Sequence, residues 1–120
     1  MANEKAVLFI SANRPIIGRE QEAMSQWTET GAWLESQQKL GWLSRWDGLW
    51  LTAHGGTMNT AFICYGDRAK LDEWRRTEGF ESWVFRSQSC MEGLSVVPGV
   101  NWAAMRETMD RRVKAVGPNR

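Results

Sequence analysis

Residues 41–65 limit the possible folds most strongly, because they read as two β-strands with apolar side chains on both faces. A polar turn with two adjacent glycines, at 54–59, joins the two strands. On the first strand Trp46 and Trp50 share one face, and Leu49 lies on the other. A single layer of helices covers only one face of a sheet. The second face therefore requires a partner, most simply another copy of the chain.

The segments on either side of this hairpin complete a sheet of a known kind. Along the chain we expect a strand at 5–13, a helix at 19–40, the hairpin, helices at 67–76 and 80–92, a strand at 94–97 ended by Pro98 and Gly99, and a helix at 102–116. The strand at 5–13 is a continuous apolar run, which indicates burial on both faces. Split β-α-β units in this order form a four-stranded antiparallel sheet with helices on one face. We therefore predict an α+β, ferredoxin-like β-α-β-β-α-β fold in a single domain, residues 1–120, with an extra C-terminal helix and a loose tail at 117–120.

Two of the expected helices carry an apolar stripe with the spacing of an α-helix. The stripe of the helix at 19–40 consists of Ala23, Met24, Trp27, Gly31 and Leu34, and that of the last helix of Trp102, Met105, Met109 and Val113. Each stripe indicates a helix that packs against an apolar surface.

Composition argues against several classes of function. The 15 basic and 14 acidic residues leave a net charge of +1, without the basic surplus of a nucleic-acid-binding protein. No apolar run approaches the roughly 20 residues of a membrane span, and the run near the N-terminus is too short for a signal peptide, so we expect a cytoplasmic protein without a membrane partner. Cys64 and Cys90 lack C-x-x-C spacing and read as buried thiols. Two cysteines and a single histidine are too few ligands for a zinc site. We therefore predict neither a metal nor a cofactor.

Eight tryptophans in 120 residues are more than one small core accommodates easily. An indole buries a large apolar area, but its N–H requires a hydrogen-bond acceptor. Some of these rings must therefore line a pocket, form a subunit interface or lie on the surface.

Four short motifs resemble the dimeric α/β-barrel superfamily, and more narrowly a group of uncharacterised bacterial proteins of this length. They are Arg14–Glu20 at the entry to the first helix, His54–Asn59 in the turn, Gly66–Leu71 at the second helix and Val96–Val100 near the last strand. The resemblance covers about residues 5–110 and implies a ferredoxin-like fold and a homodimer. The superfamily includes cofactor-free monooxygenases, haem-degrading enzymes and small stress proteins, so it implies the fold more firmly than an activity.

His54 is the candidate catalytic residue, because histidine alone titrates near neutral pH. It could act as a general base or as the proximal ligand of a haem. Alternatively it is a turn residue bonded to a backbone carbonyl, since the sequence offers no second histidine and no recognisable triad.

Arg14 and Arg19 flank the turn that leads into the first helix, where backbone N–H groups also favour an anion. Together with Asn59 and His54 they could hold a carboxylate or a phosphate. The alternative is that these arginines form salt bridges, with Glu20, Glu22 or Asp47 as the partner.

Four aromatic residues, Trp27, Trp46, Trp50 and Tyr65, are candidates for the lining of an apolar cavity between helix and sheet. The alternative is that they belong to the core and the dimer interface. We therefore predict a homodimer with an aromatic-lined cavity that binds a small organic ligand. A cofactor-free monooxygenase or haem-handling enzyme that uses His54, and a protein-interaction module, are the alternatives.

Overall fold

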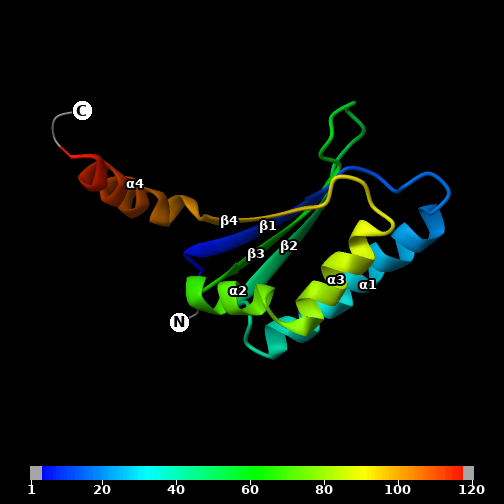
Figure 1. Cartoon of the computed structure of the whole chain (residues 1–120), viewed down its shortest axis with the longest axis horizontal. Helices are drawn as coiled ribbons and strands as arrows, with labels where there is room; N and C mark the ends of the chain where they lie inside the picture. The colour runs from blue at the N-terminus through cyan, green and yellow to red at the C-terminus, as the bar shows by residue number, and fades with distance from the viewer. Residues whose placement is uncertain (1–3, 118–120) are drawn as a thin grey trace.

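The computed structural model describes residues 4–117, which form a four-stranded antiparallel sheet with helices packed on one face (Figure 1). The elements are β1 (Ala6–Ala12), α1 (Glu20–Lys39), β2 (Arg45–Trp50), β3 (Thr60–Gly66), α2 (Arg68–Arg75), α3 (Glu78–Gln88), β4 (Ser95–Val100) and α4 (Trp102–Val116). The strand order is β2-β3-β1-β4, so β1 and β3 are central and β2 and β4 are the edges. This arrangement confirms the predicted ferredoxin-like α+β fold. Of the predicted tail, only Gly117 lies within the described residues.

The covered face of the sheet, which points toward α1, α2 and α3, carries the core. Leu8 and Ile10 of β1 are fully buried there, and Phe62 and Cys64 of β3 lie beside them. Trp83 of α3 closes the core from the helical side. Alternate residues of β1 thus form the apolar surface against which the helices pack.

The open face of the sheet carries a second set of apolar side chains, over which Figure 1 shows no helix of the described chain. This set, which shares a face by strand register, is Val7, Phe9, Leu49, Ile63, Tyr65 and Val97. Leu49 and Val97 are about half exposed, at 45% and 50%. On β1 itself Val7 and Phe9 are half-buried on this face, so the predicted burial on both faces is only partial within a single chain.

Helix α1 has defined ends. At its start the Glu20 carboxylate accepts a hydrogen bond from the backbone N–H of Gly18 at 2.8 Å, and so satisfies a donor near the helix terminus. At its far end Gly41 adopts a φ of +88°, and its N–H donates to the carbonyl of Gln38 at 3.0 Å. Glycine reaches this left-handed conformation at little cost, which explains why the helix stops where predicted.

The hairpin loop is longer than predicted. Strand β2 ends at Trp50, whereas the apolar pattern suggested that it continues to Ala53, and residues 51–59 form the connection. Gly55 supplies a positive φ of +80°. Gly56 has no positive φ, but a Cβ there would lie only 2.7 Å from Nε2 of His54. One glycine is thus needed for its backbone angle and the other for space.

The predicted end of α3 at Glu92 is wrong, because the helix stops at Gln88. The chain beyond it instead pairs with the segment after β1. The N–H of Asn13 donates to the carbonyl of Glu92 at 2.8 Å, and the N–H of Ile16 donates to that of Cys90 at 2.9 Å. These bonds between distant segments compete with the helix and end it.

The last strand is also longer than predicted, since β4 continues through Pro98 to Val100. We expected Pro98 to end it because proline has no N–H for the ladder. Strand β4 is an edge strand that pairs only with β1. Proline is tolerated on an edge because its missing donor can point to the unpaired side.

Helix α4 continues from the end of β4 and projects away from the other helices (Figure 1). Ala104 is its one buried residue within the described chain. The predicted stripe is instead open to solvent, with Trp102 82%, Met109 53% and Val113 65% exposed. The helix is therefore as predicted, but its apolar side has no partner within the described chain.

Candidate functional site

The tryptophans of α1, α2 and α3 form one aromatic cluster, defined here as Trp27, Trp33, Trp74, Phe80 and Trp83. Trp33 stacks on Trp83 with ring centroids 5.2 Å apart and an interplanar angle of 3°. Phe80 meets Trp74 edge to face at 4.7 Å. Offset stacking and edge-to-face contacts are favourable arrangements of aromatic rings, so the cluster fills the space between the helices.

Four indole N–H groups in and beside this cluster have an acceptor. Trp27 donates to Oγ1 of Thr60 at 2.8 Å, and Trp83 to Oγ1 of Thr30 at 2.9 Å. Trp74 and Trp46 donate to the side chains of Gln37 and Glu35, at 2.9 and 3.2 Å. Buried indoles with satisfied donors cost little polar desolvation, which is how so many tryptophans fit into one small structure.

The structure does not bring the four predicted aromatic ligands together. Trp27 is buried in the cluster, and Trp46 lies half-buried over Gly31 on the same side of the sheet. Trp50 is 64% exposed at the end of β2. Tyr65 lies on the open face, where the guanidinium of Arg45 sits 3.9 Å from the centre of its ring. The sheet separates Tyr65 from the tryptophans, so these residues do not line one pocket.

His54 lies in the exposed loop between β2 and β3. Its Nδ1 is 2.7 Å from the backbone carbonyl oxygen of Thr52, a short contact within the loop itself. This geometry agrees with the alternative that His54 is a turn residue. Figure 1 shows the loop extending beyond the end of the sheet.

The predicted anion-binding residues are engaged with other protein groups. Arg14 pairs with Glu92 at 3.0 Å, which was not among the expected partners. Arg19 pairs with Glu22 at 3.1 Å, as the salt-bridge alternative predicted. The amide of Asn59 donates to Oδ1 of Asn13 at 2.7 Å and so links the hairpin loop to the end of β1. The geometry around these side chains is that of structural contacts.

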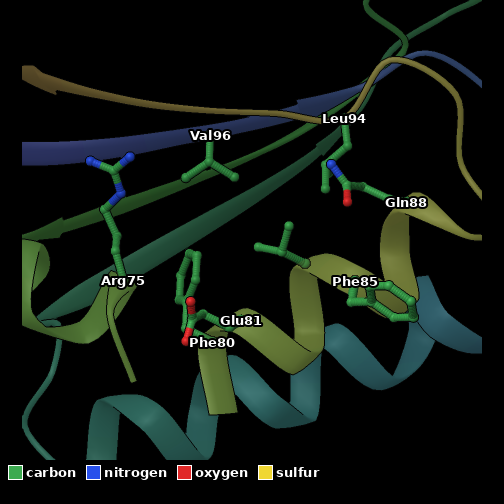
Figure 2. A pocket seen from close by; sticks show the side chains of 8 residues that line it. Arg75, Phe80, Glu81, Phe85, Gln88, Leu94 and Val96 are labelled. Atoms are coloured by element: carbon green, nitrogen blue, oxygen red, sulfur yellow. The ribbon is translucent and has the colours of Figure 1, made fainter. Parts of the chain in front are cut away.

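A cavity of about 430 Å³ lies between α3 and the edge strand β4, open on one side (Figure 2). Its lining is Arg75, Phe80, Glu81, Val84, Phe85, Gln88, Leu94 and Val96. Ligand sites in proteins are concave, mostly apolar and typically of about 300–1,000 Å³. This cavity has a volume in that range, although three of its eight lining residues are polar or charged, and we treat it as the candidate functional site.

Two polar side chains lie at opposite ends of this cavity in Figure 2. Arg75 extends from the end of α2 toward β4, and Gln88 reaches from the end of α3 toward Leu94. Between them are the apolar side chains of Val96 and Phe80. The arrangement offers a cation at one end and an amide at the other, with apolar side chains and the carboxylate of Glu81 between them.

None of the residues that line this cavity was among the predicted site residues. A sequence could have indicated the position of this cavity only indirectly. The strand β4 is an edge strand, and the helices that cover the sheet leave space beside such an edge. The depth of that space depends on how α3 packs, which periodicity alone does not specify.

Residues 4–117 offer neither a metal site nor a membrane-spanning helix. No group of three or more histidine, cysteine, aspartate or glutamate side chains is placed to hold a metal ion there. No helix in the same range is long and apolar enough to cross a membrane.

Comparisons with known proteins establish the fold. No protein-family model matches the chain, and no curated protein sequence is significantly similar to it. Among solved structures, the chain is similar to a dimeric protein of unknown function and ferredoxin-like fold from Bacteroides fragilis NCTC 9343. The TM-score is 0.60 at 11% identity, and the match covers 80% of this chain and 96% of the other. It is also similar to SnoaB, a cofactor-independent oxygenase from Streptomyces nogalater, with a TM-score of 0.51 at 13% identity over 81% of this chain and 91% of SnoaB. At these identities the likeness shows the ferredoxin-like fold alone.

Proposed function

We propose that this chain is a homodimeric binding protein for a small organic molecule, which it holds in the cavity between α3 and β4. The observation that carries the proposal is the cavity itself, about 430 Å³ with polar ends and, between them, apolar side chains and the carboxylate of Glu81. A ligand of one or two rings would bury its apolar surface there, and the polar ends would orient it.

The packing behind the cavity supports a preformed site. Phe80 belongs both to the cavity wall and to the aromatic cluster, where it contacts Trp33, Trp74 and Trp83. Close-packed rings have little freedom to rearrange. The tryptophans therefore contribute to this proposed function by holding one wall of the cavity in place.

The dimer is the second part of the proposal. The open face leaves Phe9, Ile63 and Val97 without a helix over them, and the stripe on α4 is likewise uncovered. Two unpartnered apolar surfaces on the same chain favour self-association, in which a two-fold axis satisfies both copies at once. The protein from B. fragilis is described as dimeric and ferredoxin-like, which supports the same expectation for this chain.

A second candidate is a cofactor-independent oxygenase, favoured by the likeness to SnoaB. In this candidate His54 is the general base, as the sequence suggested. The test is incorporation of ¹⁸O from ¹⁸O₂ into products of a panel of phenols and hydroquinones, measured by mass spectrometry. Incorporation that disappears in His54→Ala supports the candidate, and no incorporation with wild type rejects it for these substrates.

Cavity filling tests the preferred proposal. In Val84→Trp an indole occupies the cavity, whereas Ser82→Trp adds the same group at an exposed position of α3 that does not line it. Ligand-observed NMR with a library of one- and two-ring compounds should show binding to wild type and to Ser82→Trp, and none to Val84→Trp. Binding that survives in Val84→Trp would contradict this location of the site. Native mass spectrometry of the same samples reports the subunit number and any retained small molecule.

A further inference from the structure

We propose that the cavity between α3 and β4 selects a monoanionic carboxylate carried on a flat apolar body, and that Arg75 binds the carboxylate. The inference rests on the proposed binding function and specifies the chemical class of its ligand.

Among the described residues, Arg75 has no ionic or hydrogen-bonding partner for its side chain. Its side chain is half-buried, and within residues 4–117 neither a salt bridge nor a side-chain hydrogen bond engages its guanidinium. Figure 2 shows the side chain directed from α2 toward β4, near Val96, rather than away from the protein. By contrast Arg14, Arg19 and Arg45 each contact a carboxylate of the chain. A guanidinium held beside an apolar wall is thus available to an anion from outside.

The chemistry of a guanidinium favours a carboxylate. Its planar fork donates two parallel hydrogen bonds that match the two oxygens of a carboxylate, and such charge-assisted pairs are stronger than neutral ones. A neutral ligand in the same place would displace water from the guanidinium without replacing the hydrogen bonds that the water made.

The charge balance of the lining favours a single negative charge. The cavity residues include one cation, Arg75, and one carboxylate, Glu81, and no salt bridge joins the two. A dianion such as a phosphate monoester would meet one positive charge and one negative charge. A monoanion meets the same two charges, but it pairs with Arg75 and has no second charge that lacks a cation and is repelled by Glu81. The amide of Gln88 then remains for a neutral polar group at the far end.

The apolar part of the ligand follows from the walls. Val96 of β4 and Leu94, just before that strand, face Phe80 and Val84 of α3 across the cavity. A slot between a strand and a helix suits a flat ring system better than a bulky one. The exposed ring of Phe85 at the rim, 74% accessible, adds apolar surface that a ligand would cover.

A matched pair of probes tests the class directly. 2-Naphthoate and 2-naphthamide have nearly the same shape and differ in charge, and isothermal titration calorimetry gives the Kd of each for the full chain. We expect wild type to bind 2-naphthoate at least about tenfold more tightly than 2-naphthamide. Arg75→Gln should abolish this preference while leaving the Kd of 2-naphthamide nearly unchanged. Arg75→Lys, which keeps the charge but loses the fork, should retain part of it.

Arg76→Gln is the control, because Arg76 is the exposed neighbour of Arg75 and does not line the cavity. It should keep the wild-type preference, and circular dichroism of every variant checks that the fold is intact. Equal affinities of wild type for the two probes, or a preference that persists in Arg75→Gln, would overturn the assignment of Arg75 while leaving the binding function standing. Failure of both probes to bind, together with no binding in the compound library, would overturn the binding function and this inference with it.

Discussion

Helices α1 and α4 look alike in the sequence and differ in the structure. Both carry apolar residues at three- and four-residue intervals. α1 packs on the sheet and buries Ala23, Trp27 and Leu34, whereas α4 buries Ala104 and leaves its stripe exposed. The comparison teaches that an apolar stripe predicts that a helix has a partner, but not whether the partner belongs to the same chain.

A matched pair of tryptophans provides the strongest test of this difference. Trp27 on α1 is 8% exposed and Trp102 on α4 is 82% exposed. Trp27→Ala removes a buried ring and its bond to Thr60, so we expect a loss of about 3–5 kcal/mol in the free energy of unfolding. Trp102→Ala should change it by less than about 0.5 kcal/mol in dilute, monomeric protein. Urea unfolding measures both, and similar losses would mean that α4 packs on its own chain.

The buried side of α1 includes polar residues that periodicity missed. Thr30 is 1% exposed; its hydroxyl donates to the carbonyl of Gln26 at 2.7 Å and accepts from Nε1 of Trp83. Thr30→Val keeps the shape but leaves the indole N–H of Trp83 without an acceptor, and we expect a loss of about 1–3 kcal/mol in urea unfolding. Thr30→Ser keeps the hydroxyl and is the control. A loss in Thr30→Val no larger than that in Thr30→Ser would show that the hydrogen bond contributes little.

These cases show how far sequence patterns reach. The four-stranded antiparallel sheet and the α1 boundaries follow from patterns in the sequence, and the structure bears them out. The end of α3 could not be predicted in this way, because backbone bonds to residues 13–16 compete with the helix.

The candidate site was harder to predict from the sequence than the fold. The sequence singled out residues by chemical type, chiefly histidine, tryptophan and paired arginines. Arg75 stands out because tertiary packing half-buries it beside β4 without a salt-bridge or side-chain hydrogen-bond partner in the part of the chain that the structure describes. Likewise, whether a tryptophan lines a cavity or fills a core depends on its neighbours, such as Thr60 for Trp27.

A charged substitution on α4 tests whether a second copy of the chain covers its apolar stripe. Met109 lies on the exposed stripe, so a carboxylate there would be buried if the stripe packs on a second copy. We expect Met109→Glu to raise the dimer dissociation constant at least about tenfold in analytical ultracentrifugation, equivalent to about 1.4 kcal/mol. Ala103→Glu introduces the same charge at an exposed position outside the stripe and should leave self-association unchanged. Unchanged association in Met109→Glu would exclude this surface from the dimer.

Cys64 tests how completely the helices close the covered face. Burial raises the pKa of its thiol from the ordinary 9.0 to about 12. Between these values the unfolded chain loses the thiol proton while the folded chain retains it. The unfolded state then binds fewer protons, so the contribution of Cys64 to stability is complete below pH 9 and is lost as the pH rises toward 12. Urea midpoints at pH 7.5 and pH 10.5 should therefore differ more in wild type than in Cys64→Ala, which has no thiol to ionise. Equal differences in the two proteins would mean that water reaches Cys64 beneath the helices that cover the sheet. The contrast between this closed face and the open α4 would then be smaller than the structure indicates.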